Sequence, residues 1–162
     1  MPEVICDTSP LQYLYQIGLL QILPELAGRI VVAPAVEEEL QVGRGLGVFL
    51  PDLYQLDWIE IRRPASRPAI PLINDLGPGE TETLMLSLES PDSVAILDDA
   101  LARRVAEVLE IRFTGTLGLL LDAKQAKLIP AIRPLLDQLQ ALRFRLSPQA
   151  RSTILKLADE EG

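Results

Sequence analysis

The chain has 162 residues, 48% of them hydrophobic and 23% charged, which indicates one globular domain with a buried core rather than a disordered chain. It contains no histidine and a single cysteine, which excludes Ser-His-Asp triads, His-ligated zinc and thiolate zinc clusters. The net charge of −8 argues against a passive nucleic-acid binder, and the remaining oxygen-bearing side chains favour hard cations such as Mg²⁺ and Mn²⁺.

Short apolar runs and amphipathic segments alternate along the chain. In chain order, the pattern predicts a strand at 3–6, a helix at 10–22, a strand at 29–33, a helix from Pro34 to about Gly43, a mobile loop or helix break at 42–47, a strand at 58–62, a proline-rich loop at 62–72, a helix from Glu80, a strand at 94–97, a helix at 100–109, a strand at 111–114, and helices at 117–127, 132–142 and after Ser147.

Strands separated by helices predict βαβ units. We therefore expect an α/β fold, a three-layer α/β/α sandwich around a mainly parallel sheet of about five strands. We expect a single domain over residues 1–162, with a core at 3–146 and a C-terminal helix at 147–162.

The sequence also predicts where the protein resides. No run of about 18 apolar residues is present, so we expect no membrane span, and the N-terminus MPEVICD has no signal-peptide pattern. The lone Cys6 indicates a small core residue in a reducing, cytoplasmic setting. Charge is uneven: residues 1–100 hold 5 Lys and Arg against 16 Asp and Glu, and residues 101–162 hold 10 against 7. The C-terminal third is therefore the part expected to face an anionic partner.

Four acids follow strands or begin helices. Asp7 ends the first strand and Asp98 ends the VAIL strand, so both lie at the carboxyl edge of the sheet if these strands are neighbours. Glu39 is the member of its acidic triplet expected to turn toward that edge, and Glu80 follows a Gly-Pro-Gly turn. The alternatives are a helix cap for Asp7, a solvated helix face for Glu39, and capping or dipole pairing for Glu80.

A cluster of carboxylates is stable when a divalent cation neutralises it, because like charges otherwise raise one another's pKa. Such a cluster supports metal-assisted phosphodiester hydrolysis, in which an ion lowers the pKa of a bound water and stabilises charge on the phosphate.

In their order and spacing, five segments resemble the PIN-domain family, in its toxin-like subgroup from prokaryotic toxin–antitoxin modules. The segments are ICDTSPL at 5–11, VVAPAVEEEL at 31–40, LGPGETETLMLSLE at 76–89, AILDDALARRVAE at 95–107 and FTGTLGLLLDAK at 113–124. The resemblance covers residues 3–146. It implies an α/β/α sandwich with an acidic pocket that binds Mg²⁺ or Mn²⁺ and cuts RNA, usually in single strands or loops.

Carried over by position, the resemblance makes Asp7, Glu39, Glu80 and Asp98 the catalytic and metal-binding residues. Glu80 is one methylene longer than the Asp common at the third position of other branches. We expect Ser9, Asp99 and Thr116 to hydrogen-bond the carboxylates or metal-bound water.

The sequence thus predicts a divalent-metal-dependent endoribonuclease, restrained by an antitoxin protein, with a homodimer implied by analogy. One alternative is a catalytically weak or inactive PIN-like module that binds nucleic acid or protein, which the net charge of −8 favours. A phospho-acceptor receiver domain is a further alternative. That fold expects an acid pair at its first strand and a lysine after its fifth, whereas here the pair follows the fourth predicted strand and Thr114 and Gly115 end the fifth.

Overall fold

The computed structural model describes residues 2–65 and 75–161, and within them five parallel strands form one sheet in the order β3-β2-β1-β4-β5. The strands are β1 (Glu3–Cys6), β2 (Ile30–Val32), β3 (Ile59–Ile61), β4 (Ser93–Ile96) and β5 (Phe113–Thr114). Strand β1 is central and pairs with β4 in a register that places Cys6 opposite Ile96. Because these two strands are parallel neighbours, the chain leaves both at the same edge of the sheet.

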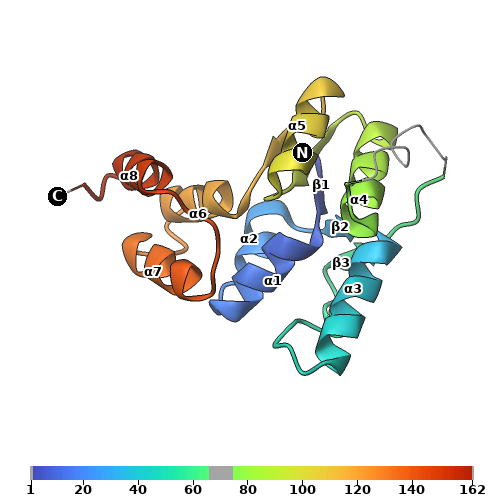
Figure 1. Cartoon of the computed structure of the whole chain (residues 1–162), viewed down its shortest axis with the longest axis horizontal. Helices are drawn as coiled ribbons and strands as arrows, with labels where there is room; N and C mark the ends of the chain where they lie inside the picture. The colour runs from blue at the N-terminus through green and yellow to red at the C-terminus, as the bar shows by residue number, and fades with distance from the viewer. Residues whose placement is uncertain (1, 66–74, 162) are drawn as a thin grey trace.

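Helices cover both faces of this sheet (Figure 1). They are α1 (Thr8–Gln16), α2 (Ile22–Ala27), α3 (Pro34–Gly45), α4 (Pro78–Glu89), α5 (Ala100–Val108), α6 (Thr116–Gln125), α7 (Arg133–Ala141) and α8 (Pro148–Leu157), with a 3₁₀ turn at Leu53–Gln55. In Figure 1, α6, α7 and α8 lie toward the C-terminus on one side of the molecule, and α3 and α4 lie on the opposite side.

Two hydrophobic clusters make up the core, a large one around the centre of the sheet and a smaller one between β4, α4 and α5. Successive residues of β4 alternate between them, since Ala95 packs with α4 and α5 whereas Ile96 packs with α1, α2 and α6. The predicted α/β/α sandwich with a parallel sheet of about five strands is confirmed. Cys6 is fully buried, as expected for a core residue.

The prediction of one helix at 10–22 is wrong. Helix α1 begins at Thr8 and ends at Gln16, and α2 begins at Ile22. Gly18 between them adopts φ 75°, a left-handed conformation that glycine tolerates and that cannot continue a right-handed helix. The apolar spacing of Leu19 and Ile22 persisted across this break and concealed it.

Other boundaries also differ. Helix α3 continues to Gly45, because Gly43 lets Leu50 pack closely against the helix where a Cβ would collide with it. Helix α4 begins at Pro78 rather than at Glu80. The predicted cap of the last helix is confirmed, since Ser147 Oγ accepts a hydrogen bond from the Ala150 N–H at 3.0 Å.

The proline-rich loop predicted at 62–72 is only partly described: residues 62–65 contain neither helix nor strand, and residues 66–72 lie outside the described residues. Across the ranges that are described, no helix is long and apolar enough to cross a membrane.

Candidate active site

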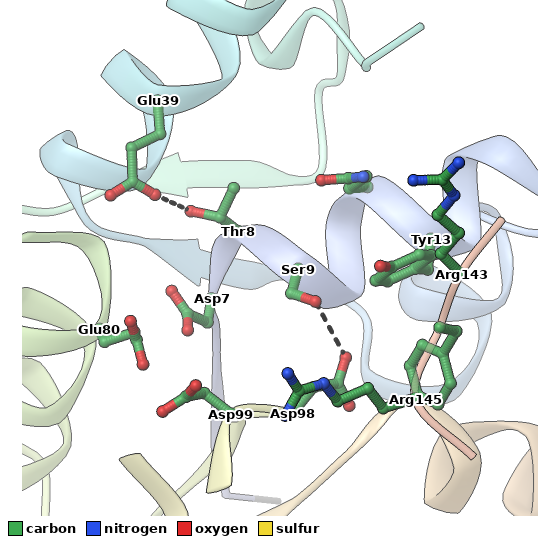
Figure 2. Close-up of a pocket in the computed structure, with 12 residues that line it drawn as sticks. Asp7, Thr8, Ser9, Tyr13, Glu39, Glu80, Asp98, Asp99, Arg143 and Arg145 are labelled. Carbon is green, nitrogen blue, oxygen red and sulfur yellow. Dashed lines mark hydrogen bonds between the residues drawn. The ribbon is translucent and has the colours of Figure 1, made fainter. Parts of the chain in front are cut away.

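The four acids singled out in the sequence line one pocket of about 400 Å³ at the carboxyl edge of the sheet (Figure 2). Asp7 follows β1 and Asp98 follows β4, whereas Glu39 comes from α3 and Glu80 from the first turn of α4. Ser9 and Asp99 line the same pocket. Thr116 does not line the pocket, but its N–H and its hydroxyl group both donate hydrogen bonds to Asp98.

Asp7 is buried without full hydrogen bonding. It occupies the N-cap position of α1, yet its side chain makes no capping hydrogen bond, so the cap alternative does not account for it. Asp7 is 3% exposed, and its Oδ1 is buried with no hydrogen-bond partner. Burial raises the pKa of Asp7 to about 7, the Thr8 backbone N–H opposes this, and the charges of Glu80, Glu39 and Asp98 add to it.

Glu80 is satisfied on one oxygen only. Its Oε1 accepts a hydrogen bond from the Gly77 N–H at 3.3 Å, which is the capping contact considered from sequence, but its Oε2 is buried with no partner. The pKa of Glu80 is raised to about 7, first by burial and then by the neighbouring Asp99 carboxyl group. The capping contact therefore accounts for Oε1 of Glu80 but not for its buried Oε2.

Glu39 is held by two hydrogen bonds. Thr8 Oγ1 donates to Oε2 at 2.5 Å, and the Gly79 N–H donates to Oε1 at 3.0 Å. A Cβ on Gly79 would lie 2.7 Å from Glu39 Oε2, so a side chain at this position would displace the Glu39 carboxylate. Of the neighbouring acids, Glu37 is buried outside the pocket and Glu38 is exposed.

A contact between helices fixes where Glu39 lies. The Ala35 N–H at the start of α3 donates to Glu82 Oε1 at 2.9 Å, so a side chain of α4 satisfies one of the free N–H groups of α3. This bond joins the two helices that supply Glu39 and Glu80 to the pocket.

Asp98 is the most fully hydrogen-bonded of the four. The Thr116 N–H donates to Oδ1 at 2.8 Å, and Thr116 Oγ1 and Ser9 Oγ donate to Oδ2 at 2.7 and 3.4 Å. Burial raises the pKa of Asp98, and hydrogen bonds from Thr116 and the charge of Arg103 oppose the rise. Gly115 is required here, because its Cβ would lie 2.9 Å from Asp98 Oδ1.

Asp99 has a structural contact of its own. It is the N-cap of α5, and its Oδ2 accepts from the Ala102 N–H at 2.9 Å. Its carboxyl group still lies against Glu80 and contributes to the raised pKa there.

Sequence reasoning missed part of the pocket, which Thr8, Gln12, Tyr13, Arg143, Phe144 and Arg145 also line. Gln12 and Tyr13 lie three and four residues after Ser9, so helix periodicity from Ser9 could have indicated them. For the residues at 143–145, the only signal was the positive charge balance of the C-terminal third.

The donor set fits a hard divalent cation. Two buried carboxylate oxygens, Asp7 Oδ1 and Glu80 Oε2, lack partners, and oxygen ligands are those that Mg²⁺ and Mn²⁺ prefer. Within residues 2–65 and 75–161, no three carboxylates converge closely enough to ligate one ion as the side chains stand. The reason lies in the contacts above, since Glu39 is directed at Thr8 and Gly79 and Asp98 at Thr116.

A family model described as DUF3368, PIN domain, matches residues 3–160, which includes the last helix. Among curated proteins, none matches this chain. PIN domains are generally nucleases that act on nucleic acids and typically use divalent metals. The parallel five-stranded sheet and the family match together show that this chain belongs to the PIN-domain family.

Proposed function

We propose that this protein is a divalent-metal-dependent endoribonuclease that hydrolyses phosphodiester bonds of RNA in the acidic pocket. The observation that carries the proposal is the pair of buried, partnerless oxygens, Asp7 Oδ1 and Glu80 Oε2, in a pocket that Glu39 and Asp98 also line. Leaving buried carboxylate oxygens unpaired costs stability, and a bound cation is what would offset that cost.

In this proposal Asp7, Glu39, Glu80 and Asp98 hold Mg²⁺ or Mn²⁺, which supplies Lewis acidity toward the phosphate and a water of lowered pKa. The surrounding residues orient the carboxylates. Thr116 fixes the Asp98 carboxylate through both of its oxygens, and Ser9 adds a bond from the pocket side. Asp99 lies against Glu80 and biases its protonation.

The finer parts of the proposal concern substrate, partner and setting. The substrate is RNA in single strands or loops, and the protein is the toxin-like component of a cytoplasmic toxin–antitoxin system. A protein partner, an antitoxin or a second copy in a homodimer, is supported by exposed apolar side chains at the end of α3 and after it, at Val42, Leu46, Phe49 and Tyr54.

The test is incubation of the purified chain with a pool of structured RNAs in Mn²⁺, Mg²⁺ or EDTA. We expect cleavage with metal, none in EDTA, and a loss of at least about 100-fold in Asp7→Asn, since the amide nitrogen cannot ligate a cation. The matched control is Asp57→Asn, an exposed acid just before β3 at the opposite edge of the sheet. If wild type binds RNA but never cleaves it, the inactive binding module replaces the nuclease. Cleavage by Asp7→Asn at the wild-type rate would remove Asp7 from the site.

A further inference from the structure

One side of the pocket comes from the connection between α7 and α8. Arg143, Phe144 and Arg145 line it together with Asp7 and Asp98, from which they are far removed in sequence. In Figure 2 Arg143 lies on the other side of Ser9 from Asp7 and Glu80, and the Arg145 side chain extends across the view to the region of Asp98. The pocket therefore has an acidic side and a basic side.

The backbone of the basic side is anchored. The Arg143 N–H donates to the Gln140 carbonyl oxygen and the Phe144 N–H to the Leu139 carbonyl oxygen, each at 3.0 Å. The Phe144 ring packs edge-on against Tyr13 of α1, with centroids 5.0 Å apart. Phe144 thus fixes the segment against the core, while the flanking side chains of Arg143 and Arg145 remain exposed.

Both guanidinium groups are unpaired. Among the described residues, the guanidinium group of neither Arg143 nor Arg145 forms a salt bridge or hydrogen bond, although five carboxylates line the same pocket. Most other arginines are engaged: Arg29, Arg44, Arg62, Arg112 and Arg151 in salt bridges, Arg133 with the Glu160 carbonyl oxygen, and Arg103 over the Phe113 ring. Of the described arginines with no such contact, Arg63 and Arg104 lie outside the pocket.

An RNA strand needs positively charged groups at this site, because its phosphates are negatively charged. The acidic side repels phosphate, and the whole chain carries −8. A guanidinium group matches phosphate geometry with parallel N–H donors, and it is less strongly hydrated than an ammonium group. The aromatic side chains of Tyr13 and Phe144 beside the arginines suit unpaired bases rather than a duplex.

We propose that Arg143 and Arg145 bind phosphate groups of a single-stranded RNA and hold that strand against the acidic side of the pocket. This inference rests on the proposed function and deepens it, because it names the residues that bind the substrate backbone. The two arginines supply affinity and position rather than chemistry, so their loss raises KM more than it lowers kcat.

The test measures binding of a fluorescent, unstructured single-stranded RNA to the full chain by anisotropy, in EDTA and over a range of salt. The variant is Arg143→Gln with Arg145→Gln, which keeps the stems and removes two charges. We expect at least about tenfold weaker binding at low salt, and a salt slope smaller by roughly 1.4, which is about 0.7 for each lost phosphate contact.

The control variant is Lys127→Gln with Arg104→Gln, which removes the same net charge. Lys127 matches Arg143 closely: it follows helix α6, is exposed, and has φ 63° where Arg143 has φ 69°. Neither Lys127 nor Arg104 lines the pocket. We expect this control to bind RNA like wild type, and thermal melts to show that both double variants are folded.

The outcomes separate this inference from the nuclease proposal. Equal binding by the two double variants overturns the arginine inference, even if wild type cleaves RNA. Tighter binding after loss of the arginines also overturns it, because they would then serve as internal counter-ions. Equal affinity for duplex RNA overturns the single-strand assignment. A wild type that never cleaves, but whose RNA binding depends on these arginines, defeats the nuclease proposal and supports this one.

Discussion

The ends of β1 and β4 lie side by side, and each is followed by an aspartate, buried Asp7 after β1 and half-buried Asp98 after β4, but the protein treats the two carboxylates differently. At the β4 end, Asp98 accepts three hydrogen bonds, from Thr116 and Ser9. At the β1 end, Asp7 is 3% exposed and its Oδ1 has no partner. The same strand geometry therefore produces one carboxylate that the fold itself stabilises and one that it does not.

This difference indicates where the fold gives up stability for its site. Hydrogen bonds from Thr116 and Ser9 and the charge of Arg103 oppose the effect of burial at Asp98, whereas at Asp7 only the Thr8 N–H opposes it and three neighbouring acids add to it. A buried charge without such compensation persists in proteins mainly where function requires it. We therefore expect Asp7 to respond far more than Asp98 to pH, to neutralisation and to cations.

The largest effect expected is on the pH dependence of stability in EDTA. The pKa of Asp7 is about 7 in the folded protein against 3.8 for the free residue, so the folded state binds this proton more tightly. Its stabilising contribution is complete below about pH 4 and is lost as the pH rises through 7, by an upper limit of about 4 kcal/mol.

Urea unfolding of wild type and Asp7→Asn from pH 4 to pH 8 measures this contribution as a difference. Glu80 shifts in the same direction and both proteins retain it, so the difference between them reports the Asp7 charge together with its mutual repulsion with Glu80. The two proteins should diverge steadily above pH 4, with wild type the less stable. Parallel curves across the range would mean that the Asp7 carboxylate is not destabilised in the folded state.

Next in size is the contrast between Asp7→Asn and Asp98→Asn at pH 8. At Asp7 the substitution removes a destabilised charge, and after a cost for the buried amide we expect a gain of about 3 kcal/mol, or roughly 6–12 °C in Tm. At Asp98 the Asn oxygen still accepts from the Thr116 N–H, and its amide can donate to the two hydroxyl groups, so Tm should change by less than about 2 °C. Calorimetry on both variants checks this. Equal shifts in Tm would show that the fold destabilises the two carboxylates to the same extent.

The sequence predicted the fold because the strands are short apolar runs separated by amphipathic segments, and this pattern needs no long-range information. It placed Asp7 and Asp98 correctly at one edge because parallel strands share a direction. It could not distinguish their hydrogen bonding. The partners of Asp98 are Thr116, at the start of α6, and Ser9, in the first turn of α1 after the neighbouring strand β1, and only the folded chain brings them together.

The same limit applies to the rest of the pocket. The glycines at 79 and 115 were visible as turn residues, but their close approach to Glu39 and Asp98 depends on how α3, α4 and α6 pack. The arginines at 143 and 145 belong to a connection with no motif. The helix error at 10–22 had a local cause, because apolar periodicity continued through Gly18 and outweighed the glycine signal.

Bound Mn²⁺ should raise the stability of the folded protein mainly through Asp7, the aspartate whose Oδ1 has no hydrogen-bond partner. A cation that binds only the folded state stabilises it by about 2.7 kcal/mol at a hundredfold excess over its dissociation constant, or roughly 5–11 °C in Tm. Asp7→Asn should lose most of this shift, and the surface control Asp57→Asn should keep it. Thermal melts at millimolar Mn²⁺ provide the measurement, and an unchanged Tm in wild type would contradict a metal site at these acids.

The smallest expected effect concerns Asp98, the aspartate that the fold supplies with hydrogen bonds. Thr116 is fully buried, and Thr116→Val keeps its shape while removing the hydroxyl that donates to Asp98 Oδ2 at 2.7 Å. We expect a loss of about 1 kcal/mol in stability and a rise in the pKa of Asp98, because one hydrogen bond to its charged form is gone.

Thr83→Val is the matched control: Thr83 is equally buried, but its hydroxyl donates to the Gly79 carbonyl oxygen within its own helix. Both variants should lose similar stability in urea, while only Thr116→Val should shift the acid limb of the pH–rate profile of RNA cleavage upward. If the two profiles coincide, the Thr116 hydroxyl supports the fold alone, and the charged form of Asp98 is stabilised by the Thr116 N–H, by Ser9 and by the charge of Arg103 instead.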